Sequence, residues 1–86
     1  MGDFVDLELP LGIQLVWEWL RENGYATNST RPILYAGAYC FVCNRGPLLN
    51  FLGGSLYYGF HMIYLGSLSD PDFFEKLDKL MGSKWD

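Results

Sequence analysis

The middle of this 86-residue chain is rich in aromatic side chains and almost free of charge. Between Arg31 and Asp70 the one formally charged side chain is Arg45, and this stretch holds most of the Tyr and Phe residues. A chain of this length buries only about 60% of its unfolded surface, so it cannot enclose that many large rings. We therefore expect part of the apolar surface to meet a second molecule: a partner protein, another copy of the chain or a lipid.

Composition and charge narrow the classes that the chain fits. Residues 1–86 are short enough for a single domain, and a hydrophobic content of 50% is typical of a folded protein rather than a disordered one. The net charge of −4 disfavours binding to nucleic acid, because phosphate recognition needs a basic face. The acidic N-terminal residues do not resemble an export signal, so we expect a cytoplasmic location.

Two segments have the periodicity of amphipathic helices. Ile13, Val16, Trp17 and Leu20 fall on one helical face, and Asn23-Gly24 is a typical helix end. A second helix is predicted after Ser69-Asp70-Pro71-Asp72, with Ser69 as its N-cap and Asp72 completing a capping box. Its apolar face consists of Phe73, Phe74, Leu77, Leu80 and Met81, and Asp72 and Lys76 are spaced for an ion pair.

Three segments favour β-strands. Val5, Leu7 and Leu9 alternate with acidic residues, and residues 33–43 and 55–65 are rich in β-branched and aromatic side chains. Residues 48–52 are interpreted as an apolar linker that ends at Gly53-Gly54. The predicted fold is α+β in the order β-α-β-β-α, a short antiparallel sheet with two helices on one face.

Alternation along residues 33–43 separates two faces. Leu34, Ala36, Ala38, Cys40 and Val42 form a mostly small face that we expect to receive the helices. Tyr35, Tyr39 and Phe41 would then share the opposite, open face, and large open apolar surfaces usually mark interfaces. The residues predicted to contact a partner are Tyr35, Tyr39, Phe41, Tyr57 and Tyr64, with Arg45 at the rim, and Asp3, Asp6 and Glu8 are acidic contact candidates.

Cys40 and Cys43 form a C-x-x-C motif, and His61 is the single histidine. A tetrahedral zinc site needs four ligands, so these three residues are weak metal candidates unless two copies share one ion. The favoured interpretation is that two free cysteines alternate sides along a strand. His61 is better explained as a core or interface residue than as the base of a cysteine nucleophile.

The sequence disfavours two further classes of protein, those that span a membrane and those that bind single-stranded RNA. Residues 46–68 are long enough to span a membrane, but they contain Asn50 and several glycines, and acidic rather than basic residues follow them. Aromatic sheet faces also bind single-stranded RNA, but such faces carry many basic residues, which this chain lacks.

No catalytic motif or cofactor fingerprint appears in the sequence, so we expect a non-enzymatic protein-binding module without a cofactor. Small acidic single domains of this kind include inhibitors and adaptors, such as phage-encoded viral proteins that modulate host machinery. The alternatives are a homodimeric structural protein with an interchain zinc at the C-x-x-C motif, and a small membrane-associated protein. The partner is expected to be another protein or a second copy of the chain.

Overall fold

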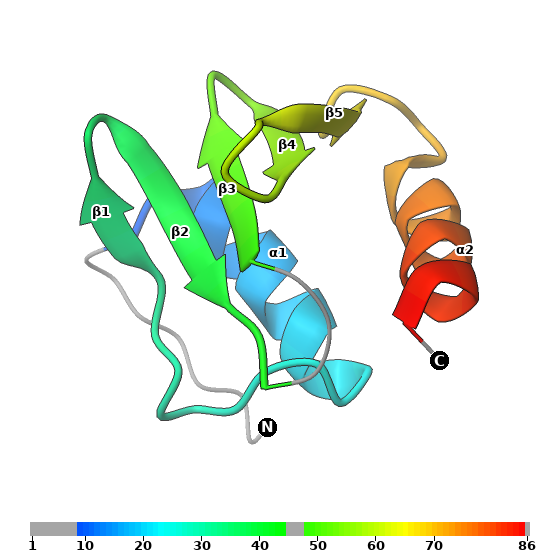
Figure 1. The fold of residues 1–86 in the computed structure, drawn as a ribbon, viewed down its shortest axis with the longest axis horizontal. Coiled ribbons are helices and arrows are strands. Elements are labelled where there is room, and N and C mark those ends of the chain that lie inside the picture. The colour runs from blue at the N-terminus through cyan, green and yellow to red at the C-terminus, as the bar shows by residue number, and fades with distance from the viewer. Residues whose placement is uncertain (1–8, 45–47, 86) are drawn as a thin grey trace.

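A computed structural model describes residues 9–44 and 48–85 of the chain, the last three of these by their backbone alone. Along the chain, one helix precedes the five strands and one follows them, which confirms the predicted α+β class (Figure 1). The predicted first strand lies, apart from Leu9, outside the described residues. In chain order the elements are α1 (Leu11–Glu22), β1 (Ile33–Tyr35), β2 (Ala38–Val42), β3 (Leu48–Leu52), β4 (Ser55–Tyr58), β5 (Ile63–Ser67) and α2 (Phe73–Trp85).

The five strands form one antiparallel sheet in which each strand pairs with the next along the chain, in the order β1-β2-β3-β4-β5. Two of the connections are two-residue hairpin turns, Ala36-Gly37 and Gly53-Gly54. All four of these residues have positive φ, the pattern of a type I′ turn, whose twist matches that of paired strands. This connectivity keeps neighbouring strands close in sequence.

The structure corrects the prediction for residues 33–65. The predicted strand over residues 33–43 is a hairpin, β1 and β2, because the Ala36-Gly37 turn reverses the chain. The predicted strand over residues 55–65 is also a hairpin, because the turn from Gly59 to Met62 separates β4 from β5 and is closed by a 3.2 Å hydrogen bond from Met62 N to Gly59 O. The predicted linker over residues 48–52 is β3, the central strand.

Both helices contribute to one hydrophobic core. The predicted apolar face of α1 is confirmed, because Ile13, Val16, Trp17 and Leu20 are all buried. These side chains belong to the same cluster as Phe41, Leu49 and Leu56 from the sheet and Phe73, Leu77 and Met81 from α2. Figure 1 shows α1 behind β2 and β3, whereas α2 lies beside β5.

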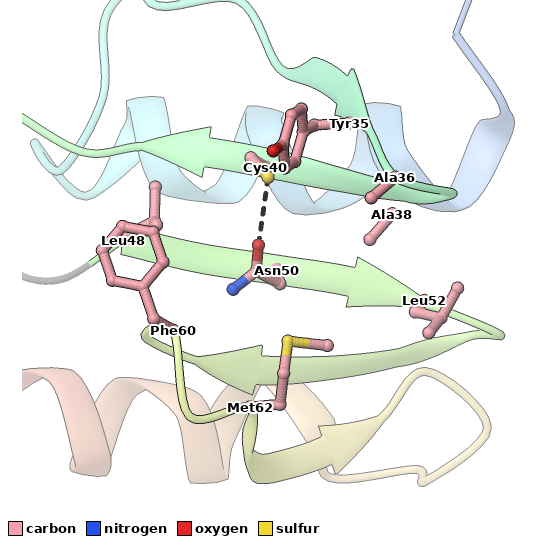
Figure 2. Close-up of a pocket in the computed structure, with 9 residues that line it drawn as sticks. All are labelled: Tyr35, Ala36, Ala38, Cys40, Leu48, Asn50, Leu52, Phe60 and Met62. Atoms are coloured by element: carbon pink, nitrogen blue, oxygen red, sulfur yellow. Dashed lines mark hydrogen bonds between the residues drawn. The ribbon is translucent and has the colours of Figure 1, made fainter.

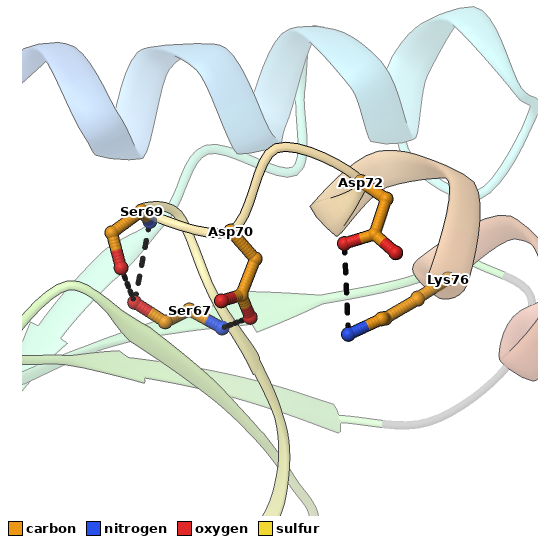
Figure 3. Close-up of polar contacts among 5 residues, drawn as sticks. All are labelled: Ser67, Ser69, Asp70, Asp72 and Lys76. Atoms are coloured by element: carbon orange, nitrogen blue, oxygen red, sulfur yellow. Dashed lines mark hydrogen bonds and ion pairs between the residues drawn. The ribbon is translucent and has the colours of Figure 1, made fainter.

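The loop before α2 differs in detail from the predicted cap. Asp70 rather than Asp72 turns back, since its Oδ2 accepts a 3.3 Å hydrogen bond from the Ser67 amide (Figure 3). Ser69 shares a hydroxyl contact of 2.9 Å with Ser67. The predicted ion pair is confirmed, with Lys76 Nζ 3.6 Å from Asp72 Oδ1. Both of its side chains are about half exposed to solvent, so it adds little stability.

Strand register decides which sheet residues face the helices. Tyr39 pairs with Phe51, and Phe41 pairs with Leu49, so the large side chains of β2 lie on the core side. Cys40 pairs with Asn50 on the opposite side. The predicted assignment of faces for β2 is therefore wrong, because the large side chains Tyr39 and Phe41 face the core, whereas the small side chains Ala38 and Cys40 face the opposite side.

Candidate interaction surface

The side of the sheet opposite α1 is covered by no described element, and we call it the open face. Tyr35 belongs to this side although Tyr39 and Phe41 do not, because the two-residue turn pairs it with Ala38 and so interrupts the alternation. Many large apolar side chains remain exposed here, which is unusual for a small soluble domain. The exposed large side chains of the open face are Ile33, Tyr35, Val42, Leu52, Phe60, Met62 and Tyr64.

A half-open pocket of about 240 Å³ lies at the centre of the open face. Ala38, Cys40 and Asn50 form its floor, and Leu48 and Leu52 come from the two ends of β3 (Figure 2). The remaining walls come from the end of β1 and two turns: Tyr35 and Ala36 at the β1–β2 hairpin, and Phe60 and Met62 in the β4–β5 turn. Residues distant in sequence are thus brought together around the central strand.

Asn50 is the polar centre of this pocket and is the one buried polar residue found among the described residues, with 7% of its surface exposed. Its Oδ1 accepts a 3.0 Å hydrogen bond from the Cys40 thiol, and its Nδ2 donates one of 2.9 Å to the Gly59 carbonyl. The two bonds connect β2 to the turn that carries Phe60 and Met62. Asn50 therefore holds one wall of the pocket in place.

Replacing Asn50 with alanine is expected to lower the free energy of unfolding by about 1–3 kcal/mol, because the Cys40 thiol and the Gly59 carbonyl lose their partner. Urea denaturation measures this difference. The matched control is Asn44→Ala, since the Asn44 side chain is exposed and its loss should change stability by less than about 0.5 kcal/mol. Equal effects of the two substitutions would contradict the positioning role of Asn50.

Backbone strain is concentrated at the pocket. Ala36 and Met62, with φ of 54° and 55°, are the non-glycine residues that adopt positive φ in the described part of the chain. This conformation costs an ordinary L-residue about 1–2 kcal/mol. Both residues line the pocket, one from each wall. Strained residues tend to gather at functional sites, so this distribution favours the pocket as a binding site.

The described residues of the open face provide no charge for an ionic ligand. Residues 32–44 and 48–69 contain no formally charged side chain, and His61 is exposed in the β4–β5 turn without lining the pocket. Phosphate and carboxylate ligands need cationic or multiple N–H donors, which this lining does not supply. No group of three or more His, Cys, Asp or Glu side chains that could hold a metal ion occurs among residues 9–44 and 48–85.

The two cysteines are free and lie in different surroundings, Cys40 within β2 and Cys43 directly after its end. Cys40 lines the pocket, whereas Cys43 packs against the hydrophobic core. Burial raises the pKa of the Cys43 thiol from 9.0 to about 11, because desolvation disfavours the thiolate. One chain therefore does not present both thiolates to one metal ion.

The predicted contact residues divide into three groups. Tyr35, Tyr57 and Tyr64 share the open face, and the rings of Tyr57 and Tyr64 meet edge to face with centroids 5.8 Å apart. Tyr39 is half-buried against the core, and Phe41 is only 1% exposed, so a partner cannot reach Phe41. Arg45 and the acidic candidates Asp3, Asp6 and Glu8 lie outside the described residues.

Sequence reasoning missed the residues that shape the pocket: Leu48, Asn50, Leu52, Phe60 and Met62. Their roles depend on β3 being a strand and on the turn between β4 and β5. One signal was present, because Asn50 is a polar residue in the centre of the apolar run Leu48–Leu52. In a central strand, such a residue must find hydrogen-bond partners in the interior.

Comparison with known proteins adds no family to this description. No protein-family model matches the chain, and neither the curated proteins nor the solved structures contain a match. Within residues 9–44 and 48–85, no helix has the length and apolar character needed to cross a membrane.

Proposed function

We propose that this protein is a non-enzymatic binding module whose open face docks a partner protein, in the manner of a small inhibitor or adaptor. The observation that carries the proposal is the exposed, uncharged apolar surface around the central pocket. Phe60 is 88% exposed and Tyr35 is 73% exposed, and both stand at the pocket rim. Aromatic anchors around a pocket are typical of the energetic centre of a protein interface.

Pocket size and chemistry favour a protein partner over a substrate. A volume of about 240 Å³ lies below the range of about 300–1,000 Å³ that is usual for small-molecule and cofactor sites. Cys40 is the nucleophile in the lining, and its S–H donates to an amide oxygen that cannot act as a general base. None of the described residues that line the pocket is a histidine or a carboxylate.

The proposal is tested by affinity capture with three immobilised forms of the protein. Phe60→Ser removes the most exposed ring of the open face, and Leu11→Ser removes an apolar side chain that is 70% exposed on α1, away from that face. We expect the wild type and Leu11→Ser to retain the same polypeptide from an extract of the source cells. Phe60→Ser should lose it.

Calorimetry with the purified polypeptide then checks the interaction directly. Removing a central aromatic anchor should weaken binding by about 2 kcal/mol or more, whereas Leu11→Ser should leave the affinity unchanged. Binding that is equally strong with all three forms would contradict a role for the open face.

A further inference from the structure

We propose that the open face binds a second copy of this chain, with Phe60 of each copy seated in the pocket of the other. This inference rests on the proposed function, because it names the partner that the open face docks. It follows from the charge of the surface, from its area, and from the presence of a ring and a pocket of matching size on one face.

The first argument is electrostatic. Two copies that each carry a net charge of −4 repel, so a stable pair needs an approach that keeps their charges apart. The described acidic side chains lie on α1, on α2 and in the loop before α2, and none lies on the open face. Pairing through the open faces leaves these side chains in solvent and brings no like charges of the described residues into contact.

The second argument concerns area. The seven exposed side chains of the open face retain between 37% and 88% of their surface. An aromatic side chain offers about 150–250 Å² in full, so together they present an area on the order of 700 Å². A single monomer usually exposes an apolar patch of about 300–600 Å², whereas each partner in a stable interface contributes about 800 Å². The open face is therefore larger than the usual patch of a monomer and approaches the size of half an interface.

The third argument is complementarity within one face. Phe60 lines the pocket at its rim, where its ring lies beside Leu48 (Figure 2), and 88% of its surface remains exposed to solvent. A dry cavity of about 150 Å³ already admits a benzene ring, so a pocket of about 240 Å³ has room for a phenyl group. Because each copy supplies one ring and one pocket from the same surface, the contact is two-fold symmetric and closes at a dimer.

The wild type, Phe60→Ser and Leu11→Ser are compared by size exclusion coupled to light scattering over a range of protein concentrations. We expect the wild type and Leu11→Ser to form dimers with equal dissociation constants. Phe60→Ser should raise the dissociation constant by about 30-fold or more, as expected for a central anchor. Since Phe60 is so exposed, the circular dichroism spectrum of the dilute variant should match that of the wild type.

A second experiment fills the pocket without touching Phe60. Alkylation of Cys40 with N-ethylmaleimide places a bulky group on the pocket floor and should convert the dimer to monomer. The control is Cys40→Ser, which keeps a donor for Asn50 but no thiol in the pocket, and which should remain a dimer after the same treatment.

The possible results separate this inference from the proposed function. A wild type that stays monomeric up to about 100 µM, or a dimer that survives both Phe60→Ser and alkylation of Cys40, would overturn the second-copy proposal. If the wild type is monomeric but still captures a different polypeptide in a Phe60-dependent way, the proposed function stands and only its partner changes. If the wild type is monomeric and capture does not depend on Phe60, both proposals are wrong.

Discussion

Replacing Phe41 with alanine is expected to lower the free energy of unfolding by about 3–5 kcal/mol, the usual cost of deleting a buried aromatic side chain. Phe41 is 1% exposed and packs in the cluster that joins α1 to the sheet. A domain of this size has a total stability of only about 4–13 kcal/mol, so the loss is a large part of it. Urea denaturation, followed by the tryptophan fluorescence to which the buried Trp17 contributes, measures the effect.

The matched comparison is Tyr35→Ala, which removes an aromatic ring from the neighbouring strand. Tyr35 is 73% exposed on the open face, so its loss should change the free energy of unfolding by about 0.5 kcal/mol or less. Comparable losses from both substitutions, or a larger loss from Tyr35→Ala, would mean that the assignment of the two faces is wrong.

The second large effect is expected in the reactivity of the two cysteines. In dilute protein at pH 8, an aromatic disulfide reagent should modify Cys40 and leave Cys43 unmodified until denaturant is added. Cys40 is open to the pocket, whereas burial holds the pKa of Cys43 near 11, which leaves about one thiolate per thousand molecules at pH 8. Cys40→Ser should abolish the reaction of the native protein, and Cys43→Ser should leave it intact.

The raised pKa of Cys43 also makes the free energy of unfolding depend on pH. The pKa of Cys43 is higher in the folded protein than its usual 9.0, so the stability that its protonation contributes is complete below pH 9. That contribution is lost as pH rises toward 11, because the unfolded chain releases its proton first. Cys43→Ala should therefore reduce the fall in stability over this range. An unchanged pH dependence would show that Cys43 is not buried in the core.

The helices could be predicted from the sequence because their signals are local. A period of 3.6 residues identifies both apolar faces, and Asn23-Gly24 marks the end of the first. The strands were harder, because their limits depend on turns that lack the usual residues. A two-residue hairpin turn normally contains Asn-Gly or Asp-Gly, whereas this chain uses Ala36-Gly37 at one hairpin and places Met62 in the left-handed region at another.

Those missed turns explain the error in the candidate site. A single strand over residues 33–43 places Tyr35 on the same side as Phe41, whereas the turn at Ala36-Gly37 moves Tyr35 to the opposite side. Side-chain size was also misleading, because the small residues Ala38 and Cys40 form the floor of a pocket and not a surface against which a helix packs. The absence of charge from the middle of the sequence did indicate an uncharged face of the sheet. Tyr35, Tyr57 and Tyr64 all lie on this face.

The most direct test of the open face as a self-binding surface is the rate at which a thiol reagent modifies Cys40 as the protein concentration rises. Cys40 lies on the pocket floor, where a seated Phe60 from a second copy would cover it. We predict that the rate falls with concentration in the wild type and in Leu11→Ser, and stays constant in Phe60→Ser. A wild-type rate that is the same at every concentration would contradict the claim.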